Sequence, residues 1–271
     1  MRLVTYKTNS KIKIGLLTSE QNHVLPLQTG EKHYLGTTLF PNEMVSLLNQ
    51  GEEAIKSLLE LEEKLAADPA TELLLPIEQI QLLAPIQRTP KNIFCVGKNY
   101  REHVKEMAGQ TSIGGDIPAM PVIFTKAPTS IIGPNDFIES YPELTQALDY
   151  EVELAVVIGK TGKNIPEEAA MDYVFGYTIA NDVTARDRQK AHHQWFLGKG
   201  LDTFSPLGPH LVHKNEIPDL TKVTLTSKIN GELRQSGCVA DLIFSVPHLI
   251  ATISSGLTLE PGDMILTGTP A

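Results

Sequence analysis

Cysteine, long apolar runs and an export signal are scarce or missing in this chain of 271 residues. Its two cysteines, Cys95 and Cys238, lie far apart and outside any C-x-x-C or Cys/His spacing, which argues against a disulfide framework or a zinc site. No apolar run approaches the roughly 18 to 20 residues of a membrane helix. The N-terminus alternates polar and apolar residues and lacks the apolar block of a signal peptide. We therefore expect a cytoplasmic protein without a membrane partner.

The chain also has fewer basic than acidic residues. The chain has 23 lysines and arginines against 32 acidic residues, a formal net charge of −9, and its basic residues are scattered. A nucleic acid or an anionic membrane surface would be repelled on average, so a small molecule is the expected partner. At 41% hydrophobic residues, the chain can form a large core.

The N-terminal region predicts a small α+β domain. Short alternating runs up to about residue 30 indicate strands, and apolar residues at helical spacing predict a helix over about 42–66. The proline-containing segment LLPIEQIQLLAPIQRTPKN then indicates an extended linker. We place a small N-terminal domain at 1–75 and a catalytic domain at 76–271.

The larger region is dominated by short apolar or alternating runs bounded by Gly, Pro, Asn and Asp, which predict strands. Two helical stretches interrupt them, at about 166–172 and about 241–255, the second with Asp241 as a possible cap and Pro247 as a possible kink. The expected fold class is α+β, with a β-rich roll or barrel as the larger domain.

The strand-like stretch LDYEVELAVVI at 148–158 carries acidic residues on one face, at the edge of a core. Glu151 and Glu153 lie two residues apart and lean to the same side of a strand. The apolar run VFGYTIA ends at Asp182, which a neighbouring strand would bring to the same place. Converging buried carboxylates require a proton or a cation. Three oxygen ligands without a thiolate suit Mg²⁺, Mn²⁺ or Ca²⁺, whereas the alternative for an isolated E-x-E pair is a solvated strand face.

Further polar residues accompany the carboxylates. In VGKNYREHVKEM, His103 and Glu106 are three residues apart, the spacing of neighbours on a helical turn, where a carboxylate orients an imidazole as a general base. The glycine-containing loop 107–119 is suited to a lid. Lys199 between two glycines can approach a ligand closely and stabilise an enolate. For each of these residues taken singly, the alternative is an exposed polar side chain or a member of a salt-bridged loop.

The motifs GKNYxxHxxE, FTKxPTS, LDYExELAVVIGK, VFGYTxxNDVTARD, GKGLDTFxPLGP, NGELRQ and TGTP together resemble the fumarylacetoacetate hydrolase superfamily. The resemblance runs from about residue 93 to 270. It is closest to bacterial members that decarboxylate oxaloacetate, cleave acylpyruvates or isomerise 2-hydroxyhepta-2,4-diene-1,7-dioate. The family pattern continues past TGTP with a glycine-rich turn and further strands, so we expect those C-terminal strands to be missing from this chain.

The resemblance implies a role for each matching residue. Glu151, Glu153 and Asp182 match Mg²⁺ or Mn²⁺ ligands, and His103 and Glu106 match a catalytic dyad. Lys199 matches an active-site lysine. The positions that match substrate contacts are Arg186, Gln189, Lys126 and Thr269. The family fold is a β-rich roll with a smaller N-terminal domain, usually assembled as a homodimer.

The expected function is that of a divalent-metal-dependent enzyme that acts on 2-oxo acids through an enolate. Oxaloacetate decarboxylation and acylpyruvate hydrolysis, both C–C bond cleavages, are the first expectation. One alternative is isomerisation of the 2-hydroxyhepta-2,4-diene-1,7-dioate type, and another is a metal-binding regulatory protein without turnover. The sequence does not separate the chemistries, because all require one metal, one enolate and one acid or base.

Overall fold

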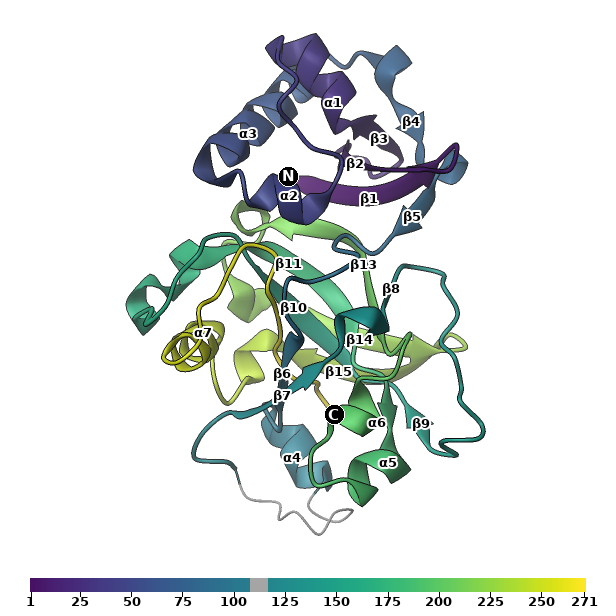
Figure 1. Ribbon diagram of the computed structural model, residues 1–271, viewed down its shortest axis with the longest axis vertical. Helices are drawn as coiled ribbons and strands as arrows, with labels where there is room; N and C mark the ends of the chain where they lie inside the picture. The colour runs from purple at the N-terminus through teal and green to yellow at the C-terminus, as the bar shows by residue number, and fades with distance from the viewer. Residues whose placement is uncertain (108–116) are drawn as a thin grey trace.

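The computed structural model describes residues 1–107 and 117–271, without the side chains of Glu106 and Met107. One large sheet runs through the molecule (Figure 1). Its 12 strands are β1 (Arg2–Thr8), β2 (Lys11–Leu17), β3 (His23–Pro26), β4 (Leu75–Pro76), β5 (Gln81–Leu83), β6 (Ile93–Gly97), β7 (Val122–Lys126), β8 (Ile131–Ile132), β10 (Val152–Ile158), β11 (Val174–Asn181), β13 (Ser205–His213) and β16 (Met264–Leu266).

The strands follow the order β4-β3-β2-β1-β13-β11-β10-β16-β6-β7, while β5 pairs with β1 and β8 with β13. Neighbours are antiparallel except at the parallel pairs β16–β6 and β13–β8. The predicted α+β class and β-rich roll are confirmed. Within the described residues, the path ends at β4 and β7 without closing, so the sheet is not a closed barrel.

The central strand β10 is buried on both faces. Its even-numbered side chains, such as Leu154, pack in one core with Leu249 of helix α7 (Val246–Ser254). Ala155 and Val157 point the other way into a second core that includes residues of helix α3 (Gly51–Ala67). Because side chains alternate along a strand, two apolar layers leave room for polar side chains only at the end of β10.

The N-terminal segment joins the sheet directly, because β1 pairs with β13. The helix predicted over 42–66 is present as two helices, α2 (Met44–Leu48) and α3, with a break at Gly51, whose φ is +72°. The predicted linker contains the strands β4 and β5, which pair with β3 and β1, and a 3-10 helix at Ile77–Gln79 between them. A domain boundary at residue 75 stays a prediction.

Two details of the predicted helices are wrong. The helix expected over 241–255 begins at Val246, where Ser245, and not Asp241, accepts the capping hydrogen bond from the His248 N–H. Pro247 lies in the first turn, where its missing N–H costs nothing, and not at an internal kink. The helical stretch predicted at about 166–172 is present as a 3-10 helix, Glu167–Tyr173.

The remaining elements of the described chain are short. The strand predicted at 148–158 is broken into β9 (Leu148–Asp149) and β10, and β9 pairs with β12 (Thr184–Ala185). A separate hairpin is formed by β14 (Thr224–Ile229) and β15 (Glu232–Cys238). The short helices are α1 (Leu27–Gly30), α4 (Arg101–Met107), α5 (Arg186–Ala191) and α6 (Phe196–Lys199), together with a π-helical turn at Glu31–Leu35. The remaining 3-10 helices are Thr71–Leu73, Ile77–Gln79, Pro128–Ser130, Lys214–Glu216, Leu220–Lys222 and Val239–Asp241.

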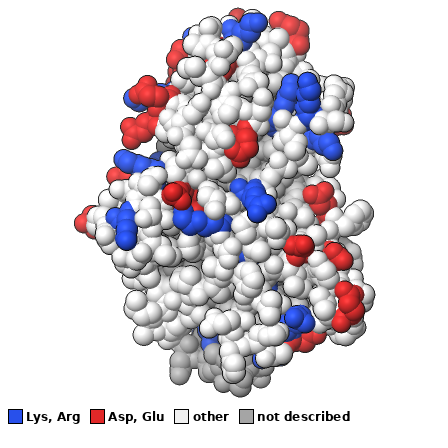
Figure 2. All heavy atoms as spheres, viewed as in Figure 1, with Lys and Arg blue, Asp and Glu red and all other residues white. Residues whose placement is uncertain are grey.

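Acidic and basic side chains are interspersed over the face drawn in Figure 2, without a broad patch of either sign. Every helix in the described part of the chain is too short or too polar to cross a lipid bilayer.

Candidate active site

Two antiparallel strands bring three carboxylates to one place. Asn181 at the end of β11 pairs with Val152 at the start of β10, so Asp182 follows beside Glu151. The Asp182 N–H donates to the Glu151 carbonyl oxygen at 2.8 Å. One carboxylate oxygen from each of Glu151, Glu153 and Asp182 lies within 4.8 Å of the others. Their exposed fractions are 5%, 1% and 0%, so water does not screen the charges.

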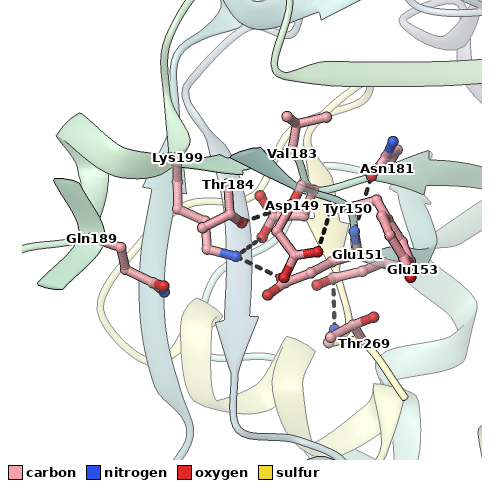
Figure 3. A network of polar contacts seen from close by, with 12 residues as sticks. Asp149, Tyr150, Glu151, Glu153, Asn181, Val183, Thr184, Gln189, Lys199 and Thr269 are labelled. Carbon is pink, nitrogen blue, oxygen red and sulfur yellow. Dashed lines mark hydrogen bonds and ion pairs between the residues drawn. The ribbon is translucent and has the colours of Figure 1, made fainter. Parts of the chain in front are cut away.

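Lys199, at the end of α6, lies between two of these carboxylates. Its ammonium Nζ is 2.5 Å from Glu151 Oε2 (Figure 3). The same Nζ is 2.8 Å from Asp182 Oδ2. Lys126, at the end of β7, approaches from another side, with Nζ 2.5 Å from Asp182 Oδ1 and 3.0 Å from the Val183 carbonyl. Both lysines are buried, so these charge-assisted hydrogen bonds form away from solvent.

Arg186 bridges the buried Glu151 and the more exposed Asp149. Its Nη1 is 2.7 Å from Glu151 Oε1, and its Nη2 and Nε are 2.7 and 2.8 Å from Asp149 Oδ2. One turn later in α5, Gln189 Oε1 accepts from Arg186 Nη1 at 3.2 Å. The guanidinium is therefore held in a fixed orientation by three side chains.

Burial and the neighbouring charges shift the pKa values of these groups in different directions. Burial opposes ionisation of Glu151, but Lys199 and Arg186 outweigh it and lower its pKa to about 2. Burial lowers the pKa of Lys199, while Asp182 and Glu151 more than offset this and raise it above its ordinary value. Lys199 is thus a permanent cation at neutral pH, suited to stabilising negative charge and unsuited to removing a proton.

Glu153 differs from the other two carboxylates. Its Oε2 accepts from the Gly268 N–H at 2.7 Å, and among the described residues no lysine or arginine forms an ion pair with it. Burial, Asp182 and Glu151 together raise its pKa well above the ordinary value. This carboxyl group therefore needs either a proton or an added cation.

Gly268 supports Glu153 through backbone geometry that only glycine adopts readily. Its φ is +102°, and a Cβ built there would lie 2.8 Å from Asn99 Cβ and 3.1 Å from the Val96 carbonyl oxygen. A side chain at this position would displace the N–H that holds Glu153.

The donor set fits a hard divalent cation. The described cluster offers three carboxylates and neither thiolate nor imidazole, the ligand type that Mg²⁺ and Mn²⁺ prefer. Two lysines offset part of the charge but leave Glu153 uncompensated. Each of these carboxylate oxygens retains a lone pair beyond the hydrogen bond that it accepts, so cation coordination and the observed ion pairs are compatible.

A small cavity of about 20 Å³ opens beside the carboxylates, enough for one water-sized particle. Its lining residues are Val96, Gly97, Lys98, His103, Phe124, Glu151, Glu153, Arg186, Gln189, Trp195, Lys199 and Thr269.

Most predicted site residues meet at this cavity. His103, Glu151, Glu153, Arg186, Gln189, Lys199 and Thr269 line it, and Asp182 lies directly behind it. Lys126 is not among the lining residues, because its ammonium is turned to Asp182. The side chain of Glu106 and loop residues 108–116 lie outside the described part of the chain.

Sequence reasoning missed the aromatic wall of the cavity. The rings of Phe124 and Trp195 meet edge to face at 5.2 Å, and Lys199 Nζ lies 5.2 Å from the Phe124 ring centre. The glycine at position 97 is a sequence signal for this wall, because a Cβ there would lie 2.4 Å from the Trp195 ring. The apolar residues themselves gave none, because they are also ordinary core residues.

Comparisons with known proteins show which proteins this chain resembles. The family model described as fumarylacetoacetate (FAA) hydrolase C-terminal matches residues 92–271. Oxaloacetate tautomerase YisK of Bacillus subtilis (strain 168) is 43% identical over 273 residues, covering 100% of this chain and 89% of that protein.

Two solved structures extend the comparison. A fumarylacetoacetate hydrolase from psychrophilic Exiguobacterium antarcticum is 39% identical with a TM-score of 0.79, covering 100% of this chain and 87% of that one. A 2-hydroxyhepta-2,4-diene-1,7-dioate isomerase from Mycobacterium marinum is 31% identical with a TM-score of 0.71, covering 100% and 88%.

Proposed function

The chain belongs to the fumarylacetoacetate hydrolase family of enzymes, and from that premise we propose that it catalyses metal-dependent keto–enol interconversion of oxaloacetate or a closely related 2-oxo diacid. The observation that carries the proposal is the buried group of Glu151, Glu153, Asp182 and Lys199, which combines a cation site with a fixed positive charge. The full-length similarity to an oxaloacetate tautomerase supports the choice of substrate.

The metal site of this proposal consists of Glu151, Glu153 and Asp182, with Mg²⁺ or Mn²⁺ as the cofactor. A divalent cation there supplies a Lewis acid that polarises the oxygens of a bound 2-oxo acid. Lys126 holds Asp182 in place through its 2.5 Å contact, so we assign it to ligand orientation and not to substrate contact.

Proton transfer is the chemical step. A proton leaves C3 of oxaloacetate and a proton is delivered to the oxygen on C2, so one C–H bond is exchanged for one O–H bond without loss of carbon. We assign the transfer to His103, which lines the cavity, with Glu106 as its partner. Lys199 stays protonated and offsets the negative charge that develops on the C2 oxygen.

Substrate recognition falls to the remaining polar residues of the cavity. Arg186 and Gln189 enter it from α5, and Thr269 lies in the segment that follows β16. A guanidinium fixed by neighbouring side chains binds a carboxylate with little loss of conformational freedom. Arg186 and Gln189 would therefore hold a carboxylate of the diacid, whereas the Thr269 hydroxyl already donates to the Val152 carbonyl.

Isomerisation of a 2-hydroxyhepta-2,4-diene-1,7-dioate is a second candidate. Its support is the similarity to the Mycobacterium marinum isomerase over the whole chain. This reaction uses the same proton transfer along a longer conjugated acid. Decarboxylation of oxaloacetate and hydrolysis of acylpyruvates use the same charge stabilisation but break a C–C bond.

Product analysis by NMR in D₂O tests the proposal and separates these reactions. The metal-loaded protein would be given oxaloacetate, a short acylpyruvate and a hydroxydiene dioate. We expect accelerated deuterium incorporation at C3 of oxaloacetate with little pyruvate. Pyruvate as the main product would replace the proposal with C–C cleavage, and turnover of the diene alone would favour the second candidate. No turnover of any substrate would contradict an enzymatic role.

We also propose that the protein assembles as a cytoplasmic homodimer. Ile179 and Ile229 are 43% and 39% exposed and line a largely apolar groove of about 340 Å³, together with Pro206 and Pro209. Exposed apolar side chains along a groove favour association. Light scattering during size-exclusion chromatography measures the assembly, and a monomer at micromolar concentration would contradict it.

A further inference from the structure

A buried glutamine outside the cavity lining holds the strand segment between two of the carboxylates. Gln235, on β15, is 8% exposed. Its Oε1 accepts from the Val152 N–H at 2.9 Å, and its Nε2 donates to Thr269 Oγ1 and to the Pro270 carbonyl, both at 2.8 Å. Val152 is the residue between Glu151 and Glu153.

The partners fix the orientation of the amide. The Val152 N–H can only donate, and the Pro270 carbonyl can only accept, so the oxygen and nitrogen of Gln235 cannot be exchanged. Ser227 on β14 donates a further hydrogen bond to Oε1 at 3.1 Å. The amide thus makes four hydrogen bonds to three separate segments, and such a fully used network is rigid.

This network stands where the regular strand pairing ends. On one side Val152 pairs with β11, but on the other side pairing with β16 begins only at Ala155. Between these points, Thr269 Oγ1 donates to the Val152 carbonyl at 3.0 Å. Gln235 and Thr269 therefore hold both the N–H and the carbonyl of Val152, and with them the peptide groups adjoining Glu151 and Glu153.

We propose that Gln235 is a positioning residue for the carboxylate group. Gln235 accepts from the Val152 N–H and orients the Thr269 hydroxyl that donates to the Val152 carbonyl. In this way it directs Glu151 and Glu153 toward one cation, and it makes their geometry depend on the β14–β15 hairpin. The inference rests on the proposed metal-dependent function. Residues that orient metal ligands change metal affinity or activity by about 10- to 100-fold when they are replaced.

The test is the Mn²⁺ dissociation constant of the folded protein, measured by electron paramagnetic resonance without substrate. Gln235→Leu keeps the approximate volume and removes every hydrogen bond. We expect Mn²⁺ binding to weaken by about 10- to 100-fold. The matched control is Leu225→Ala on the same hairpin, a buried residue without a bond to the site, which should lower thermal stability and leave Mn²⁺ affinity unchanged.

Thr269→Val provides a second variant that keeps the side-chain shape, so the inference is tested even if Gln235→Leu does not fold. It should also weaken Mn²⁺ binding, and the double variant should lose less than the two single losses combined, because both act on Val152. Wild-type Mn²⁺ affinity in either single variant would overturn this inference and leave the metal assignment in place. Absence of Mn²⁺ binding by the wild-type protein would overturn the metal assignment and, with it, this inference.

Discussion

At the scale of single residues, the site is a set of buried charges that stabilise one another. Lys199 is paired with two carboxylates, since its ammonium contacts both Glu151 and Asp182. Removing one member of a buried ion pair leaves the others uncompensated, which costs far more than breaking an exposed pair.

Lys199→Met is therefore expected to destabilise the metal-free protein by about 3–5 kcal/mol. Added Mn²⁺ should recover part of the loss, because it supplies positive charge to the same carboxylates. The measurement is urea unfolding with and without Mn²⁺. Lys56→Met is the control, since the exposed Lys56–Glu53 pair on α3 should contribute only about 0–1 kcal/mol. Equal losses in the two variants would contradict the buried-charge account.

Glu153 gives a pH dependence of defined sign. Its pKa in the folded protein is raised above the ordinary value of 4.5, so above that pH the unfolded chain binds fewer protons than the folded one. Its contribution to stability is complete below 4.5 and is lost as pH rises, until Glu153 ionises in the folded protein. The free energy of unfolding of metal-free wild type minus that of Glu153→Gln should fall over this range. A flat difference across pH 4.5–8 would contradict the raised pKa.

The sequence predicted those site residues whose positions follow from spacing along a strand. Glu151, Glu153 and Asp182 could be brought together because a strand and its antiparallel neighbour impose their positions. Gln235 lies in the quoted motif NGELRQ, but its contacts with Val152 and Pro270 join segments far apart in the chain. No local pattern encodes such a contact.

At the scale of elements, periodicity predicted the presence of helices better than their ends. Helix α7 begins at Val246 because Ser245 caps it, whereas Asp241 precedes it in a 3-10 turn. Both residues are good N-caps, so local preference did not choose between them. Packing of Leu249, Ile250 and Ile253 against the sheet fixed the choice.

Ser245→Ala should lower the free energy of unfolding by about 1 kcal/mol, because the His248 N–H loses its capping partner. Asp241→Ala, at the position predicted from the sequence, should change it by less. Thermal or urea unfolding of the two variants decides between the caps. A larger effect at Asp241 would contradict the helix start seen in the structure.

At the scale of the whole molecule, the N-terminal segment and the site share one sheet. Leu3 of β1 pairs with Leu211 of β13, and both belong to the core that also contains Ala155 and Val157 of β10. The sequence divided the chain at residue 75 because composition changes there. Pairing across that boundary involves strands about 200 residues apart, which periodicity alone does not reveal.

Leu3→Ala should therefore destabilise the entire protein, by about 2–5 kcal/mol for a buried leucine. The single tryptophan, Trp195, lies beside the candidate site and reports on it by fluorescence. Its unfolding transition should move together with the circular dichroism signal, while Lys7→Ala on the exposed side of β1 should leave both in place. An unchanged Trp195 transition in Leu3→Ala would instead show two independently folding domains.

The central claim is that the buried carboxylates of Glu151, Glu153 and Asp182 hold a divalent cation that the chemistry requires. The most direct test follows the ultraviolet absorbance of enol-oxaloacetate as it converts to the keto form, with and without Mn²⁺, for the wild type and Glu151→Gln. We predict rapid conversion by the Mn²⁺-loaded wild type, loss of that rate after chelation, and a rate at least about 10²-fold lower in Glu151→Gln. Equal rates with and without Mn²⁺, or an undiminished rate in Glu151→Gln, would contradict the account.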